Sequence, residues 1–331
     1  MKVLIVGAGA VGQVYGYHFK KNGHQVDFLI KEKYRHTLQQ GMTLYDLNRD
    51  KQLKSPLLLR ADHLVSEWPA RHAGYDVIVI TIPSNALRQL PFDQLREACK
   101  QTPLLMLQPS SEDRMLLQQQ LPGVVIAEAL ISLIAYQTPL PDRNGDTLVQ
   151  SATPEGICFY LPPLAMPVSS ESRQLATALR QLFHHSGIKA RLSASAIEDS
   201  AVPSAFLMTF LCCLEAADWS FDNLSANPQL LKQLAQAQRQ LIPNHIPAGI
   251  KHRLAQWLSA WLCRPWLYRL LLKLSPAIVP LPLEAYLASH FRKVHQQTRL
   301  YMEDYYQQLP TTQIAELLAL CRPRNHQWHK N

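Results

Sequence analysis

Short apolar runs and amphipathic stretches alternate along the first part of the chain. The run KVLIVG at residues 2–7 is rich in β-branched side chains and ends at a glycine, which is typical of a buried parallel strand. Apolar side chains at helical spacing follow over residues 10–21, and a second apolar run, VDFLI, covers residues 26–30. The order strand, helix, strand predicts a βαβ unit at the N-terminus.

The same alternation continues beyond this unit. Further strands are predicted, in chain order, for the runs GMTLYDL, YDVIVITIP, PLLMLQP and GVVIAEAL, with helices near residues 92–100 and 112–120. Strands that alternate with helices in this way predict an α/β fold with a Rossmann-type, doubly wound parallel sheet.

The pattern changes in the second half of the chain. TLVQSATPEGICFYL predicts two strands joined near a proline and a glycine, and a helix over 170–184 precedes a strand in IKARLSA. From residue 195 to residue 321 the periodicity is helical throughout. We therefore expect an α/β domain over 1–192 and an all-helical domain for substrate binding or dimerisation over 193–331.

Three glycines between the first strand and the first helix match the pattern G-x-G-x-x-G. Gly7 permits a tight turn, Gly9 lets the backbone approach a pyrophosphate, and Gly12 lets the helix pack closely on the sheet. The helix begins at Ala10 and Val11, whose backbone N–H groups face the negative charge of such a ligand. The alternative interpretation is a tight turn without a ligand. The context of strand and helix favours a dinucleotide site.

A cluster of charges follows the second strand, where a dinucleotide-binding protein recognises the adenosine ribose. The cluster contains Lys31 and Arg35, which suit the 2′-phosphate of NADP(H), and also Glu32, which suits the ribose hydroxyl of NAD(H). We predict NADP(H) as the cofactor. The alternative is a solvated, basic start of a helix.

Composition and charge narrow the class of protein. Of 331 residues, 47% are hydrophobic and 18% are charged, which fits a folded protein with a sizeable core. A net charge of +8 favours acidic small molecules, anionic lipid or nucleic acid as partners. Because no RRM, KH or zinc-finger signature accompanies the charge, no nucleic-acid partner is expected.

The cysteines and the apolar runs bear on location. The six cysteines form no C-x-x-C pair and have no zinc spacing, so we expect no metal site and free thiols in a reducing compartment. The N-terminal apolar run is too short for a signal peptide, and no run of about 18 apolar residues predicts a spanning helix. The expectation is a soluble, cytoplasmic protein.

Residues 250–274 form a basic segment that contains Trp257, Trp261 and Trp266. Pro265 is expected to divide it into two helices. One interpretation is that the segment packs in a helical core or in a homodimer interface. The other is that it lies on a membrane surface. We favour core or homodimer packing.

The chain resembles the ketopantoate reductase (2-dehydropantoate 2-reductase) family. The resemblance begins with KVLIVGAGAVGQVYGYHFKKNGHQV and FLIK, where Lys31 falls on the family's NADP-selecting position, and resumes at QTRLYMEDYYQQLPTTQIAELLAL. It implies two domains over essentially the whole chain, and reduction of a 2-oxo acid by NADPH. It also implies a nicotinamide ring in a cleft between the domains, and a lysine early in the helical domain as general acid, with asparagine and glutamate helpers.

The chain departs from the family at each of these helper positions. The family's N-G pair after the fifth strand is replaced by Gln108 and Pro109. The segment ASAIEDSAVPSAFLMTF, where the family has its lysine, contains none, and residues 192–231 contain no basic side chain. The family's glutamate falls near Gln297 or Thr298.

Another residue must therefore supply the proton if the chain is a reductase. His290, Lys293 and Gln297 lie at helical spacing on one face of a polar helix, and we predict Lys293 or His290 as the donor. The alternative is a solvated face of mixed charge. Pro83 and Gln108, at the carboxyl ends of two strands, are expected to face the nicotinamide.

Two functions follow from these residues. The first is an NADP(H)-dependent oxidoreductase that reduces a small, anionic 2-oxo carbonyl substrate. The second, motivated by the missing lysine and N-G pair, is a non-catalytic NADP(H)-binding sensor or interaction protein.

Overall fold

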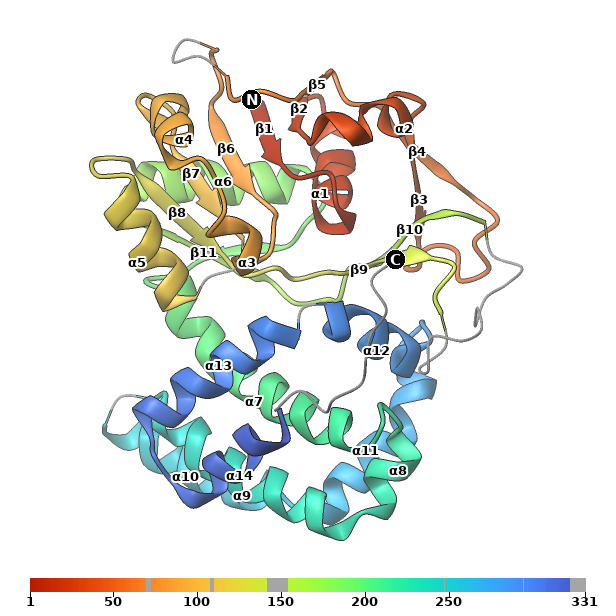
Figure 1. The fold of residues 1–331 in the computed structure, drawn as a ribbon, viewed down its shortest axis with the longest axis vertical. Coiled ribbons are helices and arrows are strands. Elements are labelled where there is room, and N and C mark those ends of the chain that lie inside the picture. The colour runs from red at the N-terminus through yellow and green to blue at the C-terminus, as the bar shows by residue number, and fades with distance from the viewer. Residues whose placement is uncertain (70–72, 108–109, 142–153, 247, 294, 322–331) are drawn as a thin grey trace. The chain divides into compact units, whose positions relative to one another are not determined.

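The computed structural model describes residues 1–69, 73–107, 110–141, 154–246, 248–293 and 295–321. Contacts divide the chain into two compact units (Figure 1). The first unit contains Met1–Leu140 and the later segment up to Ser200, and the second contains the chain from Ala201 onward. The division falls within helix α7, which covers Ala196–Ala216.

The first unit is built on an eight-stranded sheet with the order β12-β11-β8-β7-β6-β1-β2-β5. Its strands are β1 (Lys2–Val6), β2 (Gln25–Leu29), β5 (His63–Val65), β6 (Val77–Ile80), β7 (Leu104–Met106), β8 (Ile126–Ala129), β11 (Met166–Ser170) and β12 (Ala190–Leu192). The six strands from β8 to β5 are parallel, whereas β11 runs antiparallel to β8. The predicted doubly wound parallel sheet therefore describes these six strands, and β11 adds the antiparallel strand that such a sheet commonly carries.

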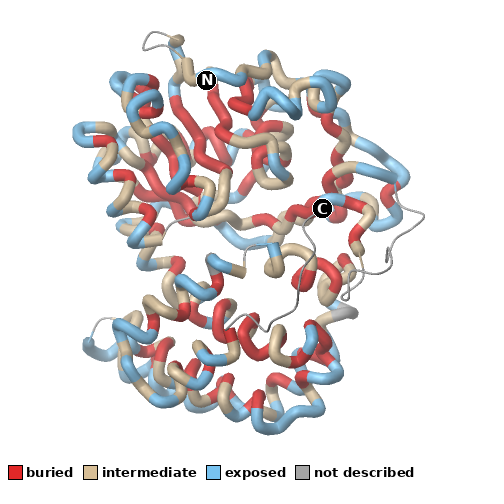
Figure 2. The backbone as a smooth tube through the Cα atoms, in the orientation of Figure 1, coloured by how far each residue is buried: buried red, intermediate tan, exposed pale blue. Residues whose placement is uncertain are grey.

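Helices cover both faces of this sheet. They are α1 (Ala10–Lys21), the 3-10 turn η1 (Glu32–Tyr34), α2 (Arg35–Gln39), α3 (Ser84–Leu87), α4 (Phe92–Cys99), α5 (Ser111–Gln120) and α6 (Arg173–His185). Successive residues of a strand point to opposite faces, so in β1 Val3 and Ile5 pack with α1 and α6, whereas Leu4 and Val6 pack with α4 and α5. Figure 2 shows the strands as the buried centre of this unit.

A second, four-stranded sheet belongs to the same unit. Its order is β4 (Leu57–Leu59), β3 (Met42–Asp46), β10 (Gly156–Tyr160) and β9 (Ile134–Thr138). The predicted strand GMTLYDL becomes β3 of this sheet, because β5 occupies the position beside β2 in the larger one. The strand predicted in TLVQSAT lies outside the described residues, whereas its partner in GICFYL is β10.

The second unit is helical over its described residues. After α7 come α8 (Phe221–Ala226), α9 (Pro228–Asn244), α10 (Ile250–Leu262), α11 (Pro265–Ile278), α12 (Leu283–Lys293), α13 (His295–Gln308) and α14 (Thr312–Leu320). This arrangement confirms the predicted fold class of a Rossmann-type sheet followed by helices. Pro265 begins α11, as expected of a proline that cannot continue the preceding helix.

Among the described helices, α7 alone has the length and composition of a membrane span, with a mean hydropathy of 1.4. A helix that is apolar on all sides is also typical of a buried core. In the apolar 18-residue stretch of α7, 44% is buried inside the protein. The side chain of Gln238 on α9 also donates a hydrogen bond to the Thr209 hydroxyl of α7 at 2.9 Å. These contacts are those of the core helix of a bundle.

Candidate cofactor and active site

The loop after β1 has the geometry that its glycines predict. Gly7 adopts φ +99°, a left-handed conformation that favours glycine. A Cβ at Gly12 would lie 2.2 Å from the carbonyl oxygen of Gly7, so the first turn of α1 closes against the loop only with glycine there. A Cβ at Gly9 would meet no atom within 4 Å, which leaves the backbone of the loop open to a ligand.

The N-terminus of α1 provides donors for an anion. Gly9 is the N-cap and has no side chain to cap the helix, and no acidic residue lies in the first turn. The backbone N–H groups of Ala10, Val11 and Gly12 have no acceptor within the helix, because the first N–H groups of any helix lack one. Unpaired N–H groups and the helix dipole at such a terminus are the features that suit a phosphate group.

The N-terminus of α1 lies at the position where doubly wound folds bind their ligands. The strands β1 and β6 are neighbours, and from this pair the chain order of the strands runs outward in both directions. Such a switch point is the place where ligands bind, outside the carboxyl ends of the strands. Thr81 follows β6, and its hydroxyl lies 2.9 Å from the carbonyl oxygens of both Val6 and Gly7. Thr81 therefore ties the end of β6 to the glycine loop, a role that the sequence analysis missed.

The charges after β2 have unequal surroundings. The Arg35 Nε donates to Glu32 at 2.8 Å, and its other nitrogens donate to the Leu64 carbonyl and to Ser66. Hydrogen bonding from Arg35 lowers the pKa of Glu32, so this carboxylate is ionised and already paired. Lys31, in contrast, is exposed, and its ammonium group makes no hydrogen bond or ion pair with the described residues. Lys31 is thus the better placed of the two predicted cations to meet a further phosphate.

A buried carboxylate joins the ends of β6 and β7. Asp113, in the first turn of α5, has a side chain only 2% exposed and lies 2.6 Å from Arg88 Nη1. It also accepts a short hydrogen bond from Ser84, the first residue of α3, which follows Pro83. Pro83 is thereby held at the carboxyl end of β6. Gln108, predicted to act with it, lies outside the described residues.

The predicted proton donors lie near the end of α12. The ring of His290 stacks on Tyr286 with 5.5 Å between centroids, and burial, assisted by Lys293, lowers the pKa of His290. Lys293 is exposed. The side chain of Gln297 lies outside the described residues. Among those described, no group of three or more His, Cys, Asp or Glu side chains has an arrangement that would hold a metal ion.

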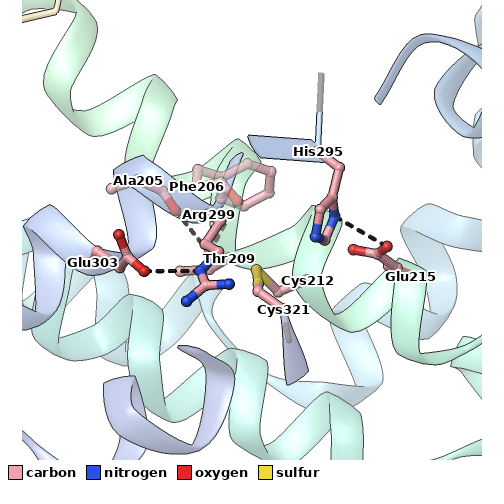
Figure 3. The surroundings of a disulfide bond; sticks show 9 residues. All are labelled: Ala205, Phe206, Thr209, Cys212, Glu215, His295, Arg299, Glu303 and Cys321. Atoms are coloured by element: carbon pink, nitrogen blue, oxygen red, sulfur yellow. Dashed lines mark hydrogen bonds and ion pairs between the residues drawn. A yellow bond between two sulfur atoms is a disulfide. The ribbon is translucent and has the colours of Figure 1, made fainter. Parts of the chain in front are cut away.

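The helical unit contains a disulfide that the sequence did not predict. Cys212 on α7 and Cys321 just after α14 are bonded, with 5.8 Å between their Cα atoms (Figure 3). The expectation of six free thiols is therefore wrong, because residues 109 positions apart meet only through the fold. The cysteines at 99, 158, 213 and 263 are free and buried, as predicted.

A charged pair lies beside this disulfide. Figure 3 shows His295, at the start of α13, directed at Glu215 of α7, with 3.2 Å between Nδ1 and the carboxylate. Hydrogen bonding to Glu215 raises the pKa of His295, while partial burial and Arg299 oppose this effect. No sequence motif links these two residues, which are 80 positions apart.

The pair predicts a pH dependence of stability. Because the pKa of His295 is raised on folding, its contribution is fully present below the unfolded pKa of about 6.5 and is lost as pH rises through the folded pKa. Since the pair is partly exposed, the expected loss is at most about 1 kcal/mol. Urea unfolding of wild type and His295→Gln at pH about 5.5 and about 8.5 would measure it. The difference in free energy of unfolding between the two proteins should shrink at the higher pH, and an unchanged difference would contradict the prediction.

Comparison with known proteins gives one family and a consistent fold. Residues 3–141 match the family model described as Ketopantoate reductase PanE/ApbA. Similar solved structures include a PanE/ApbA family ketopantoate reductase from Ralstonia eutropha JMP134, with 15% identity, a TM-score of 0.66 and 97% of each chain covered. The family match confirms the resemblance predicted from the sequence.

Two further structures have the same fold. The ternary structure of D-mandelate dehydrogenase with NADH and anilino(oxo)acetate has 12% identity and a TM-score of 0.64, with 97% of each chain covered. The probable 2-dehydropantoate 2-reductase panE from Bacillus subtilis has 16% identity and a TM-score of 0.61, with 97% of this chain and 99% of that chain covered. A search of the curated proteins finds no match.

Proposed function

We propose that this chain, whose residues 3–141 carry a ketopantoate reductase domain, is an NADP(H)-dependent oxidoreductase that reduces a small 2-oxo acid. The observation that carries the proposal is the glycine loop between β1 and α1 at the switch point of the sheet. Its free N–H groups and the dipole of α1 suit a pyrophosphate. The match to the family supports a carbonyl substrate, and the net charge of +8 favours an anionic one.

Each predicted residue has a separate task in this proposal. The N–H groups of Ala10, Val11 and Gly12 bind the pyrophosphate, and Lys31 pairs with the 2′-phosphate. Arg35, whose donors are engaged by the Leu64 carbonyl in β5 and by Ser66 just after it, holds this edge of the sheet. Pro83, at the carboxyl end of β6, lines the nicotinamide side of the site. The bound nicotinamide supplies the hydride.

The substrate oxygen needs a proton when the carbonyl is reduced. Because the pKa of His290 is lowered, its imidazole is neutral at neutral pH and is a poor acid. We therefore assign the proton, or the cation that stabilises the alkoxide, to Lys293 on α12. His290, one turn earlier, is assigned a supporting role beside Lys293 as a neutral hydrogen-bonding group.

Turnover tests this function directly. NADPH oxidation would be followed by the absorbance of the reduced nicotinamide ring across aliphatic and aryl 2-oxo acids, ketopantoate included. Lys293→Ala should lower kcat by about 10²-fold, since general acid catalysis contributes 10²–10⁴-fold. Lys232→Ala, at an exposed lysine of α9, is the matched control and should leave kcat unchanged. NADPH binding without oxidation of any substrate would instead favour the non-catalytic binding protein.

Cofactor preference is tested at the tip of β2. Lys31→Ala should weaken NADPH binding by about 10- to 100-fold, the equivalent of a lost charged hydrogen bond, and leave NADH binding nearly unchanged. Lys33→Ala, two residues along, is the control because the Lys33 ammonium lies 4.9 Å from the ring centroid of Tyr34. Isothermal titration with both nucleotides measures the difference. Equal losses for NADPH and NADH would rule out recognition of the 2′-phosphate by Lys31.

A further inference from the structure

Helices α10 and α11 expose their large apolar side chains instead of burying them. On α10, Ile250 is 87% exposed, Trp257 is 61% exposed and Trp261 is 57% exposed, and Leu254 lies on the same face at helical spacing. These side chains therefore do not pack in the core of the chain, which leaves the two other predicted alternatives, a homodimer interface and a membrane surface. An exposed apolar surface of this kind marks an interaction site.

The buried side of α10 explains this orientation. Ala255 and Ser259 of α10 and its C-cap residue Cys263 are buried, and they lie at intervals of four on the face opposite Leu254 and Trp261. Their small side chains allow α10 to pack closely against the rest of the unit. The bulky side chains are thereby left on the outside.

Helix α11 repeats the arrangement. Trp266, Leu270, Leu274 and Ile278 lie four residues apart on one exposed stripe, while Tyr268 and Leu272 face inward, their exposures being 4% and 6%. Both helices are thus amphipathic in the unusual sense that their apolar faces point away from the unit.

The charged residues on these two helices are all positive. Between residues 223 and 283 the chain contains no Asp or Glu. On the two helices and between them lie the cations Lys251, Arg253, Arg264, Arg269 and Lys273. Arg253 and Lys273 are exposed, and neither side chain makes a hydrogen bond or ion pair within the described parts of the chain. Arg264 lies over the ring of Trp261, 5.7 Å from its centroid.

We propose that α10 and α11 dock this protein on an anionic membrane surface. Tryptophan and leucine on one face and basic side chains beside it are the features of a helix that lies in the plane of the lipid headgroups. With 13 and 14 residues the helices are about 20 Å long, too short to cross the roughly 30 Å hydrocarbon core. A second copy fits less well, because a symmetric contact would bring cations against cations without an acid between them.

Co-sedimentation with vesicles tests the proposal. The full chain should bind phosphatidylcholine vesicles that contain phosphatidylglycerol at low salt, bind vesicles of phosphatidylcholine alone much less, and dissociate at high salt. The double variant Arg253→Glu with Lys273→Glu should bind the anionic vesicles at least about 30-fold more weakly, at about 1 kcal/mol for each basic residue removed. Trp257→Ala with Trp261→Ala should also weaken binding.

Matched variants separate the site from general effects of charge and hydrophobicity. Lys51→Glu with Lys189→Glu changes the net charge equally at exposed lysines of the first unit, and Leu58→Ala with Leu164→Ala removes exposed apolar side chains there. Both should bind as the wild type does. The proposal is overturned by absence of binding at low salt, by equal losses in the control variants, or by equal binding to neutral vesicles. A dimer in sedimentation equilibrium that the tryptophan variant converts to monomer would also overturn it and assign the face to a second copy.

Discussion

Gly12→Ala is expected to lower the melting temperature by about 6–12 °C and to abolish NADPH binding. The new Cβ would lie 2.2 Å from the Gly7 carbonyl oxygen and 2.8 Å from Thr81 Oγ1, so α1 must move away from the loop. Overpacking of this kind lowers the free energy of unfolding by about 3 kcal/mol. In a unit of this size each kcal/mol lowers the melting temperature by about 2–4 °C. Differential scanning calorimetry and isothermal titration measure the two effects.

Gly9→Ala is the matched control, and it separates folding from binding. Because a Cβ at this position meets nothing within 4 Å, the melting temperature should not change. If the pyrophosphate approaches the backbone there, NADPH binding should still weaken by about tenfold or more. A stable Gly9→Ala protein with unchanged NADPH affinity would show that the loop does not hold the pyrophosphate.

Asp113→Ala is expected to destabilise the first unit by about 3 kcal/mol, at the lower end of the cost of breaking a buried charged pair. The substitution removes the acceptor of both Arg88 and Ser84, and it thereby releases α3 from α5 at the carboxyl ends of β6 and β7. Chemical denaturation should detect the loss of stability. Weaker NADPH binding should accompany it, since Pro83 precedes α3.

Asp93→Ala provides an unusually close comparison. Asp93 lies 2.8 Å from Arg96, and that arginine is 37% exposed, compared with 35% for Arg88. The two pairs differ in the aspartate, which is 94% exposed at position 93 and 2% exposed at position 113. Asp93→Ala should therefore cost less than about 1 kcal/mol. Equal costs for the two substitutions would mean that burial of Asp113 does not determine its contribution.

The sequence correctly predicted the elements that depend only on residues close together in the chain. The strand, glycine loop and helix at residues 2–21 follow from β-branched residues, a left-handed glycine and helical spacing, all within a short stretch of chain. The helical character of the second unit follows in the same way from its periodicity. Pro265 marked the boundary between α10 and α11 because proline cannot continue a helix.

Features that depend on distant contacts were not predictable in this way. The four-stranded sheet joins β3 to β10, more than a hundred residues later, and no short pattern records which strands pair. The same applies to the disulfide and to Thr81, whose hydroxyl acts on a loop 74 residues earlier. At α10 the periodicity was visible, but it could not indicate whether the apolar or the small-residue face turns inward.

The bond between Cys212 and Cys321 makes a closed ring of the chain from α7 to the end of α14. Proteolytic cleavage at any single peptide bond inside that ring leaves the two fragments covalently attached. A nicked molecule would therefore migrate as one species under non-reducing electrophoresis and separate into two only after treatment with a thiol.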